Sequence, residues 1–121
     1  MHIENADLSE MYPTAFTGVT VGIGSQVLLF SKGTSLLIQC PFVCHINGVD
    51  KWGHGEEPAS STLLFDLLNR DIKSFSVEEQ GILTIDFDGQ AHVKIVPEHN
   101  GFESYVVNTP TDIFPVLLPP A

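Results

Sequence analysis

Apolar and polar residues alternate most regularly between residues 81 and 95 of this chain. Apolar side chains occupy every second position on both sides of the Asp88-Gly89 pair. This period predicts two β-strands that bury one face, and an Asp-Gly pair between such strands predicts a hairpin turn. A further run, residues 103–107, follows, so we predict a three-stranded meander over residues 81–107.

Four earlier stretches also favour strands, because they are rich in β-branched, leucine and phenylalanine residues. They are residues 16–23, 26–31, 34–46 and 71–77. Pro41 falls within the third stretch and cannot donate a hydrogen bond, so we expect two strands or one kinked strand there. Residues 27–38 and 83–95 share the order of apolar strand, glycine-containing turn and apolar strand, which favours two similar sheet layers.

One stretch, residues 59–68, has the spacing of a helix. Its apolar stripe consists of four leucines, Leu63, Leu64, Leu67 and Leu68. Ser60 and Ser61 are suitable N-cap residues, and Asn69 is a suitable residue to follow the helix end.

Three segments show neither the two-residue period of a strand nor the spacing of a helix. Residues 47–58 contain glycines and a proline and are predicted to form a loop. Residues 1–14 are expected to form an N-terminal arm, and the proline-rich tail, residues 108–121, to lie extended over a groove or an edge. Residues 1–121 are therefore predicted to form a single, mainly β (α+β) domain. We expect an antiparallel β-sandwich or half-open barrel of about seven or eight strands with one short helix.

The sequence carries no sign of a membrane segment or of secretion. No apolar run reaches about 18 residues, and the N-terminal residues are acidic instead of basic as in a signal peptide. We therefore expect a cytoplasmic protein. Cys40 and Cys44 are predicted to be reduced core thiols, because cysteines four apart on one strand lie about 13 Å apart, too far for a disulfide.

Fifteen Asp and Glu residues against five Lys and Arg give a net charge of -10. This charge disfavours binding to nucleic acid or anionic membranes and favours a basic protein partner; the alternative is that it serves solubility alone. The candidate partner-binding residues form three clusters: Asp50, Trp52, His54, Glu56 and Glu57; Glu78 and Glu79; and Asp86 and Asp88. In the alternative interpretation, the first cluster is a solvated loop and Trp52 folds back against the core.

No enzyme motif of the HExxH, GxSxG, P-loop or GxGxxG type occurs in the sequence. We therefore predict no enzyme and assign no catalytic residue, metal ligand or cofactor. An alternative is a small metal-binding protein or enzyme that uses His54, Glu56, His92 and His99, with the loops around residues 54 and 99 meeting. His92 otherwise fits an exposed strand position, and His45 fits a hydrogen-bonded structural histidine. A third possibility is a subunit that pairs through an exposed sheet edge.

Two segments carry a resemblance to known proteins. Residues 81–89 fit the pattern G-x-L-x-I-x-F-D-G, and residues 103–107 fit E-S-[WY]-x-[VL]. In these motifs the chain resembles small β-rich bacterial immunity proteins of contact-dependent growth inhibition and other polymorphic toxin systems. The resemblance implies a cytosolic protein that binds a cognate toxin domain in a one-to-one complex. Many such toxins are basic nucleases, especially RNases, and acidic residues of the immunity protein would cover the active site.

Overall fold

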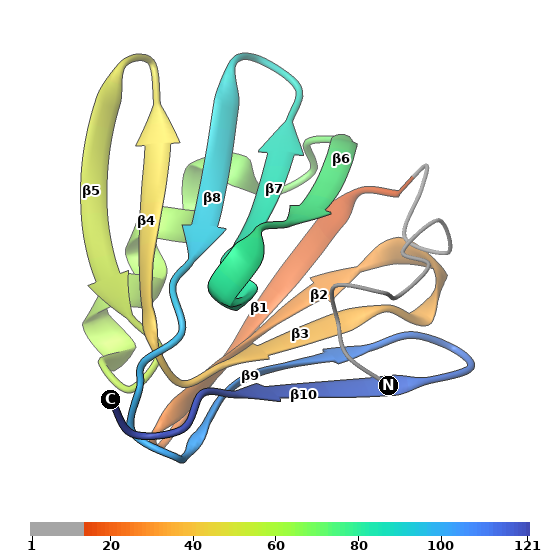
Figure 1. The fold of residues 1–121 in the computed structure, drawn as a ribbon. Coiled ribbons are helices and arrows are strands. Elements are labelled where there is room, and N and C mark those ends of the chain that lie inside the picture. Colours follow the sequence, from red (N-terminus) through yellow and green to blue (C-terminus); the bar gives the residue numbers. More distant parts are fainter. Residues whose placement is uncertain (1–13) are drawn as a thin grey trace.

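The computed structural model describes residues 14–121, which form a β-sandwich of two antiparallel sheets with five strands each. The first sheet consists, in spatial order, of β1 (Phe16–Gly22), β2 (Ser25–Phe30), β3 (Ser35–Ile38), β9 (Glu103–Asn108) and β10 (Ile113–Leu117). The second consists of β5 (Val49–His54), β4 (Pro41–Ile46), β8 (Ala91–Ile95), β7 (Leu83–Phe87) and β6 (Ile72–Val77). The strands of the two sheets cross steeply, and within these residues the sheets do not close into a barrel (Figure 1). The predicted mainly β sandwich is confirmed, but residues 14–121 form ten strands instead of about seven or eight, because β5 and β10 form in segments predicted to be a loop and a tail.

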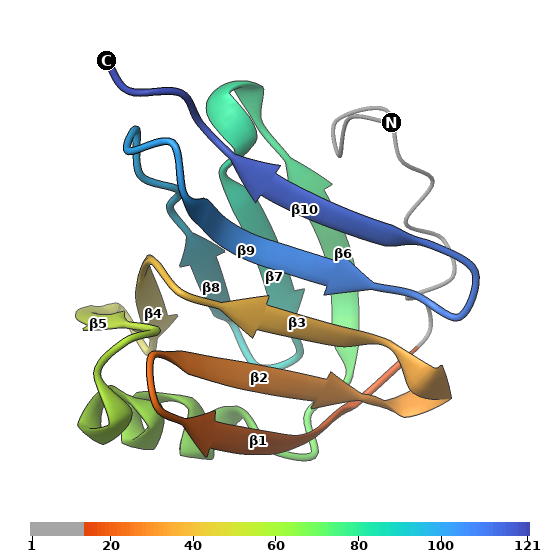
Figure 2. The same ribbon diagram turned by 90° about the horizontal axis from the view of Figure 1, so that it is seen from below.

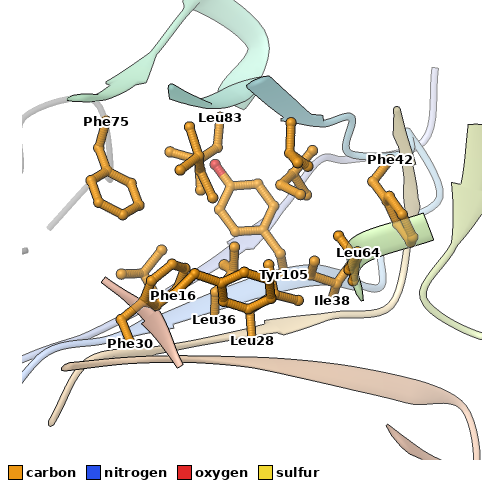
Figure 3. Close-up of a cluster of buried hydrophobic side chains, with 14 of the residues drawn as sticks. Phe16, Leu28, Phe30, Leu36, Ile38, Phe42, Leu64, Phe75, Leu83 and Tyr105 are labelled. Carbon is orange, nitrogen blue, oxygen red and sulfur yellow. The ribbon is translucent and has the colours of Figure 1, made fainter. Parts of the chain in front are cut away.

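The space between the sheets is filled by aromatic and aliphatic side chains from their inner faces (Figure 3). Phe16, Phe42, Phe87 and Tyr105 are each at most 1% exposed. Every second residue of β7 and β8 is buried, as the alternation of their sequences predicts. Burying one Phe side chain contributes about 1.5–3 kcal/mol, so these residues determine which face of each strand turns inward.

The predicted hairpin over residues 81–95 is confirmed, with Phe87 paired to Ala91 next to the turn. The prediction that residues 103–107 continue it as a third strand is wrong. β9 instead lies between β3 and β10 in the first sheet (Figure 2). Residues 104–107 of β9 are all buried, as is typical of a central strand. β8 has no free edge for β9, because it already pairs with β7 on one side and β4 on the other.

Residues 34–46 form two strands, which is one of the two alternatives predicted from Pro41. β3 ends at Ile38, the chain bends at Cys40, and β4 begins at Pro41 in the other sheet. Cys40 and Cys44 are buried and free, as predicted. They do not lie on one strand, because the bend at Cys40 precedes β4.

The prediction of a loop over residues 47–58 is wrong in its first half, which forms β5. Asn47 and Gly48 have φ angles of 54° and 79°, the left-handed pair that a two-residue hairpin turn requires. This turn folds the chain back, so that β5 pairs along the whole length of β4. The Asn-Gly pair is the sequence signal for this hairpin. The glycines that follow it favour a loop, which is why the strand was not predicted.

The helix predicted over residues 59–68 is present as the 3-10 helix η4 (Pro58–Leu67). Its three residues per turn place Ser61, Leu64 and Leu67 on one buried face. Two further 3-10 turns are η3 (Ser31–Gly33) and η5 (Glu79–Gly81). No helix in the described part of the chain is long and apolar enough to cross a membrane.

The two ends of η4 differ in how well they match the sequence. The predicted caps Ser60 and Ser61 are wrong, because no side chain caps the start of η4. The Ser60 Oγ atom instead lies 2.8 Å from the carbonyl oxygens of both His54 and Glu57, which share its single hydroxyl proton. Asn69 adopts a φ of 69° just beyond the helix, which confirms the predicted end.

The proline-rich tail, residues 108–121, lies along a sheet edge, as predicted, and contributes the edge strand β10. The Thr109 N–H donates to the Asp112 carbonyl oxygen at 2.9 Å next to the turn between β9 and β10. Hydrogen-bonded and non-bonded residue pairs alternate along β9 and β10 from this point, so the backbone nitrogen of Pro115 faces the free edge of the sheet. The N–H group that proline lacks is therefore not needed for a hydrogen bond to β9.

The predicted N-terminal arm, residues 1–14, lies outside the described residues except for Thr14. Thr14 is buried, and its carbonyl oxygen accepts a hydrogen bond from the Ile72 N–H at 2.8 Å. Ala15 forms a bridge with Asp71. The chain therefore enters β1 tied to the β6 side of the second sheet.

Candidate functional site

The outer face of the second sheet carries a continuous line of polar side chains, one from each strand. The register sets Asp50 opposite His45, His45 opposite His92, His92 opposite Asp86, and Asp86 opposite Ser74. These five residues are called the polar row below. Side chains directly opposite on antiparallel strands have Cβ atoms about 4.5–5.5 Å apart, so the row brings together residues from β5, β4, β8, β7 and β6.

Hydrogen bonds hold the side chains at both ends of the polar row. His45 Nδ1 and Asp50 Oδ1 are 2.5 Å apart, and the ring N–H must donate because an ionised carboxylate can only accept. The Ser74 hydroxyl donates to Asp86 Oδ2 at 2.8 Å. Between them the His45 and His92 rings stack, with centroids 4.6 Å apart and planes 11° apart. The two carboxylates are therefore fixed in place and can still accept further hydrogen bonds.

An exposed tryptophan lies beside the polar row. Trp52 follows Asp50 by two positions on β5, so strand alternation places both side chains on the outer face. Trp52 is 62% exposed, which makes the alternative of a ring folded against the core wrong. Its neighbours across the sheet are Val43 and then Lys94. A large exposed aromatic ring next to fixed carboxylates is typical of a protein-binding surface.

The other predicted partner-binding residues lie at the ends of the second sheet, outside the polar row. They are His54 at the end of β5, Glu56 and Glu57 after it, Glu78 and Glu79 between β6 and β7, and Asp88 between β7 and β8. The β7–β8 turn and η5 lie at opposite ends of this sheet (Figure 1). The three clusters of the sequence thus do not form one patch, and of their acids only Asp50 and Asp86 share the polar row.

His54 belongs to a separate cluster with two glutamates. Its Nε2 atom lies 3.8 Å from Glu56 Oε1 and 3.5 Å from Glu98 Oε1. Potential ligand atoms of the three residues all lie within 4.8 Å of one another. The loops around residues 54 and 98 therefore meet, as the metal-binding alternative required. One imidazole nitrogen and two carboxylate oxygens form a donor set that a divalent metal such as zinc accepts.

The hydrogen bond on the other side of the ring opposes metal binding at His54. The Glu56 N–H donates to His54 Nδ1 at 3.1 Å, so the neutral ring carries its proton on Nε2. A metal at Nε2 needs that lone pair, with the proton on Nδ1 facing an acceptor. The geometry therefore fits a ring N–H directed at carboxylates better than a metal ligand. His92 lies in the polar row and His99 is not in the cluster, so the four residues of the alternative do not assemble.

The groups near these sites do not include an activated nucleophile. The Ser74 hydroxyl donates to Asp86 and not to an imidazole of the polar row, so it does not form the serine–histidine pair of nucleophilic catalysis. Burial raises the pKa of the Cys40 and Cys44 thiols from 9.0 to about 12, and the charge of Glu98 adds to the effect at Cys40. Thiols with such a pKa stay protonated near neutral pH and react slowly.

Three members of the polar row, His45, His92 and Ser74, were not among the residues predicted from the sequence to bind a partner, and His92 was named only in the metal-binding alternative. A signal for His45 was present. The Asn47-Gly48 turn sets Ile46 opposite Val49, which places His45 opposite Asp50. Ser74 carried no such signal, because a register shift between β6 and β7 precedes it.

No protein-family model, curated protein or solved structure matches this chain. The features of the chain that bear on its function are therefore the polar row, Trp52 and the net charge of -10.

Proposed function

We propose that this protein is a non-enzymatic binding module that captures a basic protein partner on the outer face of its second sheet. The observation that carries the proposal is the polar row, where His45 and Ser74 hold Asp50 and Asp86 beside the exposed Trp52. A net charge of -10 attracts a basic partner at long range. Because the two carboxylates are already fixed, binding costs little side-chain ordering.

Within this class, the role that the sequence motifs favour is that of an immunity protein that binds its cognate toxin domain one to one. A basic nuclease such as an RNase holds phosphate groups with Lys, Arg and His side chains. Carboxylates that pair with those cations would cover the active site in place of the substrate. Opposite charges can raise association rate constants to about 10⁸–10⁹ M⁻¹s⁻¹ at low salt, which suits the rapid capture of a toxin.

The direct probe is the polypeptide encoded by the gene immediately upstream. We expect it to be a toxin, and co-expression of this protein should protect cells from it. Affinity should fall steeply as salt is raised, because exposed charges are screened. The double variant Asp50→Asn/Asp86→Asn and the variant Trp52→Ala should each weaken binding at least about tenfold.

The matched control is Glu78→Gln/Glu79→Gln, which removes two negative charges at the η5 end of the sheet. It should bind within about threefold of the wild type if the polar row is the contact. Equal affinities of the two charge variants would overturn the assignment to the polar row. An upstream gene that encodes no toxin, or co-expression without protection, would remove the immunity role.

A further inference from the structure

β5 is an edge strand, and some of its backbone groups face solvent. The two-residue turn between β4 and β5 is closed by the Ile46–Val49 pair. In a two-residue hairpin the closing pair is the one that exchanges backbone hydrogen bonds. Bonded pairs alternate along an antiparallel ladder, so the odd-numbered residues of β5 bond to β4 and the even-numbered ones turn outward. The 2.9 Å bond from the Gly55 N–H to the Cys40 carbonyl oxygen continues this alternation.

The even-numbered residues of β5 are Asp50, Trp52 and His54. The outward-facing backbone N–H and C=O groups of His54 already have hydrogen-bond partners. Its N–H donates to Ser60 Oγ at 3.1 Å, and its carbonyl oxygen accepts from the Ser60 hydroxyl at 2.8 Å. Among residues 14–121, only β4 pairs with β5, and no backbone group from outside the sheet bonds to the N–H and C=O groups of Asp50 and Trp52. The open part of the edge therefore coincides with the two residues whose side chains stand in or beside the polar row.

The edge of β5 is less protected than that of β10. Natural sheets blunt their edges with proline, bulges or covering segments, and Pro115 does this in the middle of β10. β5 contains no proline, and its pairing with β4 runs from end to end without a register shift. The edge of β5 at Asp50 and Trp52 therefore offers backbone hydrogen-bonding groups to an additional strand.

We propose that an extended basic segment of the partner pairs with β5 as an added antiparallel strand. This inference rests on the proposed function, since it specifies how the basic partner is held. An added strand would place one side chain opposite Asp50 and another opposite Trp52, both on the outer face. Arginine suits both positions, because its guanidinium pairs with a carboxylate and stacks on an indole ring. The segment recognised has arginine or lysine at every second position.

A second copy of this chain does not fit the same edge. If two copies paired through β5, the outward-facing backbone groups of even-numbered residues in one copy would bond to those of even-numbered residues in the other. A register centred on residue 50 places Asp50 opposite Asp50, and a register centred on residue 51 places Lys51 opposite Lys51. Both are pairs of like charges, which destabilise strand pairing. A register centred on residue 52 needs the backbone groups of His54, which Ser60 already holds. The partner strand is therefore expected to come from a different, basic chain.

The probe is a heptapeptide of alternating arginine and threonine with blocked termini, titrated into the isotope-labelled protein and followed by NMR. Two versions carry backbone N-methyl groups, one on two arginines and the other on two threonines. In the antiparallel pairing the arginine N–H groups face β5 and the threonine N–H groups face away. We expect arginine N-methylation to weaken binding at least about tenfold and threonine N-methylation to leave it within about threefold. Hydrogen exchange at the Asp50 and Trp52 amides should slow in the complex.

The possible outcomes separate the added strand from the proposed function. Equal binding of the two methylated peptides, with binding lost in Asp50→Asn/Asp86→Asn, would overturn the added strand and leave the charged face as the binding surface. Peptide binding that this double variant leaves unchanged would contradict the proposed function itself. No shift of the Asp50 and Trp52 amides at millimolar peptide would also overturn the added strand.

Discussion

The Tyr105 hydroxyl donates a 2.6 Å hydrogen bond to the backbone carbonyl oxygen of Gly81 inside the protein. Tyr105 belongs to β9 of the first sheet, whereas Gly81 is the last residue of η5, which leads into β7 of the second. Figure 3 shows the Tyr105 ring among the packed core side chains. The bond therefore links the two sheets through the core and ties η5 to a central strand.

Replacing Tyr105 by Phe should lower the free energy of unfolding by about 1–3 kcal/mol, because the ring remains but the buried Gly81 carbonyl oxygen loses this donor. Urea denaturation followed by circular dichroism measures the change. Phe102→Leu, at a side chain 74% exposed, is the control and should shift stability by less than about 0.5 kcal/mol. An unchanged urea midpoint for Tyr105→Phe would mean that the link contributes nothing to the fold.

Gly55→Ala should destabilise the protein by about 1–3 kcal/mol or more, because overpacking forces the backbone to shift. A Cβ atom at Gly55 would overlap the backbone carbonyl group of Ile38, next to the bend between β3 and β4. Gly18→Ala is the matched control, since its Cβ would lie 3.5 Å from Leu29 Cδ1, an ordinary contact. Thermal unfolding of the two variants should therefore differ clearly. Equal melting temperatures would show that the bend at Cys40 tolerates an added methyl group.

The strands with local partners could be predicted from the sequence, because their pairing depends on a short turn between them. The Asp88-Gly89 hairpin is the clearest case, and Asn47-Gly48 carries the same kind of signal. β9 could not be placed this way. Its neighbours are β3 and β10, and a period of two does not distinguish those partners from β8. Only burial of residues 104–107 on both faces decides between the two sheets.

The chemical character of the candidate site could be predicted, but its arrangement could not. The acidic residues and the single tryptophan, Trp52, that this face presents are evident from the composition. Asp50 and Asp86 share a row because β4 pairs with β8, a long-range pairing that no local motif encodes. His45 does have the hydrogen bond expected of a structural histidine, and that bond fixes Asp50.

Alkaline pH should destabilise the fold through its two thiols. Folding raises the pKa of Cys40 and Cys44 from 9.0 to about 12, so between these values the unfolded chain loses protons that the folded chain keeps. This contribution is fully present below pH 9 and is lost as the pH rises toward 12, by up to about 1.4 kcal/mol per pH unit for each thiol. Urea midpoints measured from pH 8 to 10.5 report this loss.

The control for the thiol effect is Cys40→Ala/Cys44→Ala. This variant starts from a lower stability because it leaves small cavities, but its stability should fall less with pH than that of the wild type. Lysine and tyrosine side chains titrate in both proteins, so the difference between the two slopes isolates the thiols. Parallel slopes would contradict a raised pKa at these cysteines.

The protein should bind no divalent metal at His54. The Glu56 N–H occupies Nδ1 of this ring, which leaves the proton on Nε2, the atom that faces Glu56 and Glu98. A Zn²⁺ titration of the untagged, chelator-treated protein should therefore give no stoichiometric binding by calorimetry and no rise in melting temperature. Glu98→Gln serves as the locating control, because it removes one of the two carboxylates of the cluster. Stoichiometric zinc binding that this variant abolishes would show that the ring adopts the other tautomer and that the cluster is a metal site.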